Sequence, residues 1–267
     1  MARQDAPSLA RTARPRRGTK RAHGAATTRR RTALPSRGRS PILPITLLVG
    51  VAGLVVIAAL IVLNGGAPTQ LAASTLVHPA SVTPTELAIG RSLGKPDAPV
   101  ALEAWSDFQC PICGEFARTV EPALIARYVT SGTLRIVHHD AAFQGAKSGA
   151  VYDESVEAGA GARCAADQGR YWPFQDWAFS NQRGENQGAF AADRLAAIAT
   201  SAGLDVPTWR ACIATGQRQA DVRAETQQAV SQGVHATPTL VVNGKVIVGL
   251  RSVAELSALI DAAATGG

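Results

Sequence analysis

The sequence predicts an α/β fold, in which a mixed β-sheet with helices on its faces is interrupted by a helical insertion and preceded by one transmembrane helix. Three observations predict this arrangement. An uncharged apolar run fills residues 42–63, a strand–helix–strand pattern occupies 100–138, and a strand–turn–strand–helix pattern occupies 237–260. Residues 147–232, between these two patterns, contain no strand-like run. The order βαβ, helical block, ββα therefore indicates one mixed sheet with an insertion.

The charges are unevenly distributed along the chain. Of the 27 Lys+Arg and 20 Asp+Glu residues among 267, residues 1–40 hold twelve basic residues and one acid, Asp5. The remainder holds 15 basic and 19 acidic residues, so the net charge of +7 comes from the tail alone. The predicted folded part lacks the basic excess typical of nucleic-acid-binding domains, and no nucleic-acid partner is expected.

The apolar run at residues 42–63 is long enough to cross a membrane. At about 1.5 Å per residue it spans about 33 Å, against a hydrocarbon core of about 30 Å. A cleaved signal peptide would have a shorter apolar region of about 7–15 residues. Arginines 29–31 lie about ten residues before the run, too far for a convincing twin-arginine signal. The positive-inside rule makes residues 1–41 a cytoplasmic, disordered basic tail and places everything after residue 63 outside the cytoplasm.

A flexible stalk is predicted for residues 64–84, which are rich in small residues and proline. The folded domain is expected to begin at residue 85, and its first part extends to residue 146. The first strand of that part is predicted for Val100–Trp105, and the second for Leu134–His138.

The helix between these two strands is predicted from apolar residues at every fourth position up to Tyr128. Pro122 falls within it and should kink it, because proline has no N–H to donate to residue 118. The helical insertion at 147–232 reads as several helices separated by glycines. Its aromatic residues between 171 and 179 are expected to form its own core.

The second part of the sheet domain is assigned to residues 233–267. Two strand-like stretches between Thr237 and Val248 flank Asn243-Gly244, the dipeptide most typical of a tight β-hairpin. Ser252 and Glu255 then form the pattern of a capping box at the start of a last helix.

Cys110 and Cys113 form a Cys-x-x-Cys motif, which is typical of either a zinc site or a redox-active pair. A structural zinc site needs a second Cys/His pair, but Cys164 and Cys212 stand alone with 47 residues between them, so no metal is expected. The redox interpretation requires a pair between a strand and a helix in a βαβ unit, and that context is present. Pro111 suits an early helical position.

The order of the two cysteines predicts their roles. Free N–H groups and the helix dipole stabilise a thiolate at a helix N-terminus. Cys110 comes first and is expected to be the exposed nucleophile of low pKa, with Cys113 one turn further as the buried resolving thiol. A stabilised thiolate favours the reduced form and makes the disulfide oxidising. Pro111 and Ile112 are expected to contact substrate, Ile112 as an apolar lip.

The segment Phe-Gln-Cys-Pro-Ile-Cys after Trp-Ser-Asp, the later Ala-Thr-Pro-Thr and the helical insertion between them resemble the DsbA family of thiol:disulfide oxidoreductases. The resemblance covers about residues 86–265 and is strongest to the membrane-anchored Gram-positive and actinobacterial type. It implies a thioredoxin-like fold and no cofactor. It also implies a cis-proline, Pro238, that faces the Cys110–Cys113 disulfide, with the Thr237 backbone binding substrate.

The same resemblance implies an extracytoplasmic enzyme that introduces disulfides into exported, unfolded proteins with free thiols. A quinone-linked membrane oxidoreductase of the DsbB or VKOR type would reoxidise it. A disulfide isomerase or reductase is an alternative, although isomerases are usually dimers and no dimerisation domain is visible before residue 85. A non-catalytic, membrane-tethered peptide-binding module is a further alternative, against which the intact Cys-x-x-Cys motif argues.

The chain departs from the family pattern at the acid that often lies on the strand beneath the cysteines. The matching position is Ala104, and Glu103 is expected on the opposite face because strand side chains alternate. Asp107 is close by, where a cap or turn role is expected. His138 and His139 are expected to be solvated or to act as caps.

Cys164 and Cys212 fall within the helical insertion, either as two buried free thiols or as a disulfide. Thiols outside the cytoplasm tend to oxidise, and related actinobacterial proteins carry a second disulfide in this block, so the resemblance favours pairing. Such a bond would stabilise the fold by about 4 kcal/mol in the chain-entropy model.

Overall fold

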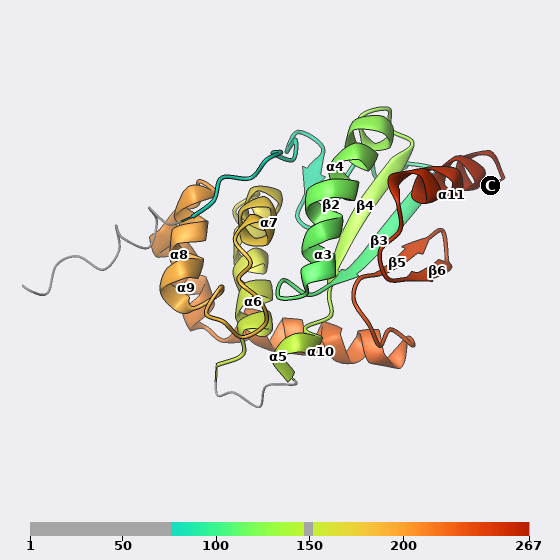
Figure 1. Cartoon of the computed structure of the whole chain (residues 1–267). Helices are drawn as coiled ribbons and strands as arrows, with labels where there is room; N and C mark the ends of the chain where they lie inside the picture. The colour runs from blue at the N-terminus through green and yellow to red at the C-terminus, as the bar shows by residue number, and fades with distance from the viewer. Residues whose placement is uncertain (1–75, 147–151, 267) are drawn as a thin grey trace, which may run out of the picture. The chain divides into compact units, whose positions relative to one another are not determined.

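The computed structural model of the chain describes residues 76–146 and 152–266. Its sheet has six strands in the order β1-β2-β4-β3-β5-β6 (Figure 1). The strands are β1 Ala88–Ile89, β2 Ser92–Leu93, β3 Val100–Ser106, β4 Leu134–Asp140, β5 Thr239–Val242 and β6 Lys245–Val248. The predicted strands are all present, and β1 and β2 are two short additions.

The sheet is mixed, as predicted. β3 and β4 are parallel, paired from Val100 with Leu134 to Ser106 with Asp140, whereas β5 runs antiparallel to β3 and to β6. Asn243 and Gly244 form the hairpin turn, where both have positive φ. This register places the end of β3 beside the start of β5, so the segments that follow Ser106 and precede Thr239 meet at one edge of the sheet.

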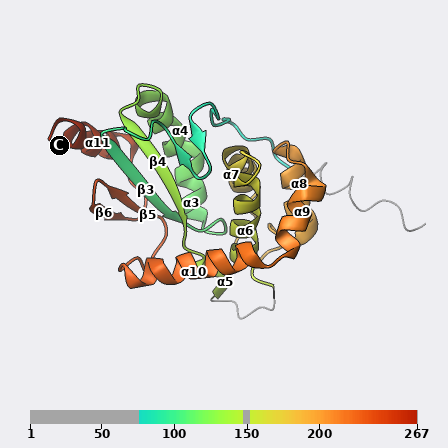
Figure 2. The same ribbon diagram turned by 180° about the vertical axis from the view of Figure 1, so that it is seen from behind.

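The helices form two groups. The helix after β3 consists of α3 Pro111–Glu115, η1 Phe116–Val120, α4 Glu121–Leu124 and η2 Ile125–Val129. The insertion contributes α6 Glu154–Ala166, α7 Tyr171–Ser180, α8 Ala192–Ser201, α9 Val206–Ala214 and α10 Gln217–Ser231. A short α5 Phe143–Ala146 follows β4, and α11 Val253–Thr265 ends the domain with the predicted capping box of Ser252 and Glu255. Figures 1 and 2 show α6 to α9 gathered to one side of the sheet and α10 running back toward it.

Pro122 does not break the helix after β3. The flanking segments η1 and η2 are π-helical, and the Glu121 N–H bonds to the Phe116 carbonyl, five residues earlier. These π-helical turns flank the position at which Pro122 has no N–H to donate. The helix remains continuous from Pro111 to Val129, with Cys113, Phe116 and Leu124 on its buried face.

The described end of the predicted stalk is attached to the insertion. The Thr83 N–H and hydroxyl donate to the Asp176 carboxylate on α7 at 2.7 and 2.9 Å. The Asn181 side chain bonds both the N–H and the carbonyl of Val77, at 2.7 and 2.9 Å. The described end of the predicted stalk is therefore bonded at Val77 and Thr83 to side chains of the insertion, about 100 residues further along the chain.

The membrane span predicted at residues 42–63 lies outside the described residues, as do the basic tail at 1–41 and the stalk up to residue 75. Within residues 76–146 and 152–266, no helix combines the length and apolar character needed to cross a membrane.

Aromatic side chains join the insertion to the sheet domain. Trp172, Phe174 and Phe179 of α7 are fully buried, as predicted for the insertion's core. The ring of Phe108, from the segment after β3, stacks on Phe179 with centroids 4.9 Å apart and meets Phe174 edge-on. The core of the insertion thus extends to the segment that carries Cys110.

Candidate active site

The Cys-x-x-Cys motif lies at the N-terminus of α3, directly after β3. Cys110 occupies the N-cap position with an extended backbone, and Pro111 is the first helical residue. The Cys110 N–H donates to the Asp107 carbonyl at 3.0 Å, so a tight turn connects strand and helix. This is the strand–helix position that the sequence predicts.

Both thiols are buried, which corrects the expectation of an exposed Cys110. Cys110 is 3% exposed and Cys113 is inaccessible, whereas Ile112 between them is 42% exposed. Thr237, on the segment before β5, lies against Cys110, whose protonated Sγ donates to the Thr237 carbonyl at 3.4 Å. Pro111 and Ile112 therefore form the solvent-facing rim of the site, and Cys110 lies just beneath it.

The environment separates the acidities of the two thiols. Interaction with the Cys113 side chain, helped by the N–H groups of Cys113 and Ile112, lowers the pKa of Cys110 to about 6 against the opposing effect of burial. Burial raises the pKa of Cys113 well above its ordinary value. A thiolate at neutral pH therefore resides on Cys110, and Cys113 keeps its proton.

Thr237 lies against Cys110, and the bond between Thr237 and Pro238 is cis. The Pro238 carbonyl accepts from the Gly249 N–H at 2.8 Å, which ties this segment to the residue after β6. Thr239 begins β5 and pairs with Trp105 on β3. The sheet register thus brings Thr237 next to Cys110 although 127 residues separate them.

The lowered pKa of Cys110 predicts how the alkylation rate of the reduced protein depends on pH. The rate of alkylation by iodoacetamide should rise as pH increases through about 6 and level off above it, because only the thiolate reacts. Initial rates measured from pH 4 to 9, with the modified residue identified by mass spectrometry, check this. A single midpoint near the ordinary cysteine value of about 8.5 would contradict it.

No acid from β3 lies beneath the cysteines. Ala104 is buried, and the Glu103 side chain is 47% exposed, 4.0 Å from His139. The prediction that Glu103 faces away from the cysteines is confirmed.

His138 is neither solvated nor a cap, so the expectation for this residue is wrong. His138 pairs with Ala104 in the sheet and is buried. Its Nε2 lies 2.6 Å from a Glu121 carboxylate oxygen, and both side chains are 2% exposed. Gln175 donates to the other oxygen of Glu121 at 2.9 Å. Glu121 lies eight residues after Cys113, a spacing that places both on one helix face and could have marked it as buried.

Asp107 stabilises the turn, as predicted. One carboxylate oxygen accepts from the Gln109 N–H and the Ser155 hydroxyl, each at 2.8 Å, and the other accepts from the Gln144 N–H at 2.8 Å. Complete burial raises the pKa of Asp107 to about 7. The turn before Cys110 is therefore fixed by side chains and backbone from both parts of the fold.

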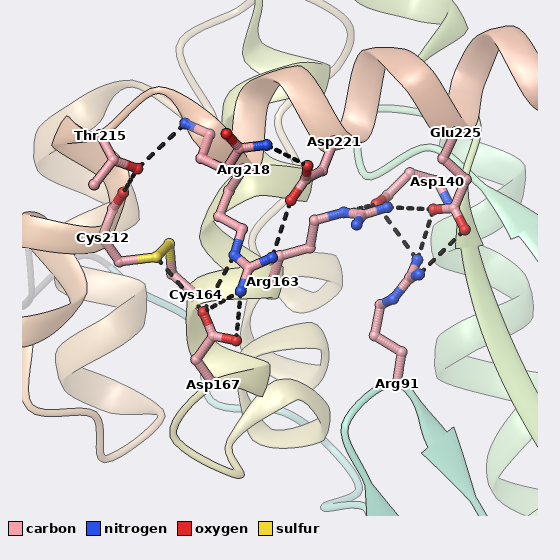
Figure 3. A network of polar contacts seen from close by, with 11 residues as sticks. Arg91, Asp140, Arg163, Cys164, Asp167, Cys212, Thr215, Arg218, Asp221 and Glu225 are labelled. Carbon is pink, nitrogen blue, oxygen red and sulfur yellow. Dashed lines mark hydrogen bonds and ion pairs between the residues drawn. A yellow bond between two sulfur atoms is a disulfide. The ribbon is translucent and has the colours of Figure 1, made fainter.

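The remaining cysteines form a disulfide. Cys164 of α6 and Cys212 of α9 are bonded, with Cα atoms 6.0 Å apart and 48 residues apart in the sequence. Figure 3 shows Arg218 of α10 beside this disulfide, between Asp167 and Asp221. The Arg218 guanidinium lies 2.8 Å from the Asp167 carboxylate and 2.9 Å from the Asp221 carboxylate. The disulfide and these ion pairs join α6, α9 and α10.

A second group of ion pairs joins α6 and α10 to the sheet. Arg163 of α6 binds Asp140 at the end of β4, at 2.7 Å, and also Glu225 of α10. Arg91 also binds Glu225, at 2.6 Å, and Figure 3 shows both arginines at this carboxylate. The His139 Nδ1 lies 2.9 Å from the same carboxylate. Sequence reasoning missed this network because its members are scattered from residue 91 to residue 225.

Among the residues that the structure describes, no group of three or more His, Cys, Asp or Glu side chains is arranged to hold a metal ion.

The family model described as Thioredoxin matches residues 87–262. The "Probable disulfide bond formation protein D" of Bacillus anthracis is 28% identical over 158 residues, which cover 58% of this chain and 70% of that protein.

Many solved structures are similar to this one, among them the following two. Oxidised BdbD from Bacillus subtilis has a TM-score of 0.60 at 22% identity, and the match covers 71% of this chain and all of that one. Oxidised Mtb DsbA has a TM-score of 0.54 at 28% identity, covering 69% of this chain and 91% of that one. The similarity to BdbD supports the fold alone. The similarity to Mtb DsbA supports the fold and adds a likeness of sequence.

Proposed function

This chain belongs to the thioredoxin family and is a DsbA-like thiol:disulfide oxidoreductase, and from this premise we propose that it introduces disulfides into exported proteins through Cys110 and Cys113. The observation that carries the proposal is the division of acidity between the two thiols. The pKa of Cys110 is lowered to about 6 while that of Cys113 is raised. A stabilised Cys110 thiolate favours the reduced pair, so the disulfide form gives up its bond readily.

The proposed cycle begins with the Cys110–Cys113 disulfide. A substrate thiolate attacks the Cys110 sulfur, the bond between the two cysteines breaks, and Cys113 leaves as a thiolate that takes up a proton. A second substrate thiolate then attacks the substrate sulfur of the mixed disulfide, and Cys110 leaves as its stabilised thiolate. Two electrons have passed from substrate to enzyme, and a low leaving-group pKa speeds the last step.

Substrate would bind along the rim of the site. Pro111 and Ile112 are exposed there, and Ile112 presents an apolar surface next to the cysteine pair. The Thr237 backbone lies against Cys110, where an extended segment of an unfolded protein could pair with it by strand addition.

The proposed location is based on the sequence, and the proposed reoxidising partner on the resemblance to the DsbA family. Residues 42–63 are long and apolar enough to anchor the chain, and the twelve basic residues before them favour a cytoplasmic N-terminus. The catalytic domain would then work outside the cytoplasm, reoxidised by a quinone-linked membrane protein of the DsbB or VKOR type. Recovery of the full-length chain in the membrane fraction of broken cells supports this location, and recovery in the cytosol contradicts it.

The reduction potential of the pair tests the proposed direction. Equilibration with glutathione buffers, followed by counting of free thiols, should give a value nearer to about −120 mV than to about −270 mV, the values typical of oxidising and reducing members of this fold. A value near −270 mV would instead favour the alternative of a reductase.

A further inference from the structure

The insertion holds the active-site turn through the side chain of Gln182, in the loop after α7. Its Nε2 donates to two backbone carbonyls of the turn, Phe108 O at 2.7 Å and Cys110 O at 2.9 Å. Its Oε1 accepts from Arg118 on the active-site helix at 3.2 Å. The Gln182 amide therefore bonds to the turn on both sides of Gln109. It also bonds to the helix that follows the turn.

We propose that Gln182 is a positioning residue that keeps the turn at Cys110 in the conformation that stabilises the Cys110 thiolate. This inference rests on the proposed role of Cys110 as the nucleophile. Gln182 does not touch the sulfur, and it acts through the backbone that carries it.

The route from Gln182 to the sulfur is short. The Cys110 carbonyl that Gln182 binds also accepts from the Gly114 N–H at 3.1 Å, the first bond of α3. The N–H groups of Ile112 and Cys113, which stabilise the thiolate, belong to that same turn. Fixing the carbonyl therefore fixes the direction in which these donors point, whereas a loose turn would let them drift from the sulfur.

Gly114 provides an independent observation. A Cβ atom at this position would lie 2.1 Å from Gln182 Oε1 and 2.5 Å from Arg118 Nη1. Both atoms are the ends of flexible side chains, so a larger residue at position 114 would have to displace the Gln182 amide and the Arg118 guanidinium from their present positions.

A second contact holds the same loop against the turn. The Asn186 N–H donates to Gln109 Oε1 at 2.5 Å, and Gln109 Nε2 lies 3.3 Å from Asn186 Oδ1. Asn186 has a φ of 55°, a conformation that asparagine tolerates better than most residues. The loop that presents Gln182 therefore contacts the active-site turn at a second point, through Gln109.

The test compares Gln182→Met with Gln187→Met in the full-length protein. Methionine keeps the length of glutamine but cannot donate, and Gln187 is an exposed residue of the same loop whose amide bonds Glu185 O within the loop. Gln182→Met should raise the pKa of Cys110, read from thiolate absorbance, and lower the equilibrium constant for oxidation of glutathione at least about threefold. Gln187→Met should match the wild type in both the pKa of Cys110 and the equilibrium constant. Unchanged values in a folded Gln182→Met variant would overturn the proposal.

Gly114→Ala offers a second route to the same displacement. Its Cβ should push Gln182 off the carbonyls and shift both readouts in the same direction. The shift should shrink in the Gln182→Met background, because the two changes act on one contact. Full additivity would show that Gly114 acts without Gln182 and would contradict the inference. A reduction potential of the wild-type Cys110/Cys113 pair near that of thioredoxin would contradict the proposed function. It would not contradict this inference, because the comparison between the variants would remain valid.

Discussion

Replacing Cys110 with alanine should reduce thiol oxidation to the uncatalysed rate, because the sulfur that forms the mixed disulfide is gone. Cys113→Ala should instead keep the attacking sulfur and lose the resolving one. In that variant the Cys110 thiolate can attack the disulfide of an oxidised cellular protein and release one of its two thiolates, and without Cys113 the resulting mixed disulfide should be long-lived. Non-reducing electrophoresis followed by mass spectrometry of the linked peptides measures both effects.

The double variant Cys110→Ala/Cys113→Ala is the matched control and should form no adducts. Adducts through Cys113 in the Cys110→Ala variant, as abundant as those through Cys110, would contradict the assigned order. Burial argues against that outcome, because Cys113 is inaccessible and its pKa is raised.

Removing the Cys164–Cys212 disulfide should cost the fold much of its stability and leave exchange chemistry in place. The bond closes a loop across 48 residues, and the chain-entropy model assigns it about 4 kcal/mol. For a domain of this size that loss lowers the melting temperature by about 10 °C. Calorimetry of Cys164→Ala/Cys212→Ala beside the wild type measures the shift, and stoichiometric thiol oxidation measures the retained activity.

The expected retention follows from the position of the bond. It joins α6 to α9, whereas the segments that contact Cys110 come from the loop at Gln182 and from Thr237. Loss of activity at an unchanged melting temperature would mean that this pair takes part in exchange, contrary to a structural role.

The sequence predicted those features that depend on neighbours in the chain. The Cys-x-x-Cys motif follows a strand, Asn243-Gly244 sits between two strand-like stretches, and Ser252 and Glu255 lie three residues apart. Each pattern is short because the physical cause is local. A helix N-terminus, a tight turn and a cap are complete within a few residues, so the sheet elements and the place of the cysteines could be derived.

What the sequence did not reveal depends on pairs that only the fold brings together. Glu121 meets His138 across 17 residues, and Gln182 meets Cys110 across 72. The contact between Cys110 and Thr237 has the same origin, since 127 positions separate them in the chain. A strand, a helix and an insertion must first pack before any of these contacts exists.

The central claim is that the oxidised Cys110–Cys113 pair passes its disulfide to a substrate. The most direct test mixes the fully oxidised protein with an equimolar amount of a reduced, unfolded secretory protein and counts free thiols on each partner by alkylation and mass spectrometry. The account predicts that the substrate loses its thiols as thiols appear on Cys110 and Cys113, and that Cys110→Ala leaves the substrate reduced. A substrate that keeps its thiols with the wild-type protein, or a reduced protein that opens the substrate's disulfides in the same buffer, would contradict it.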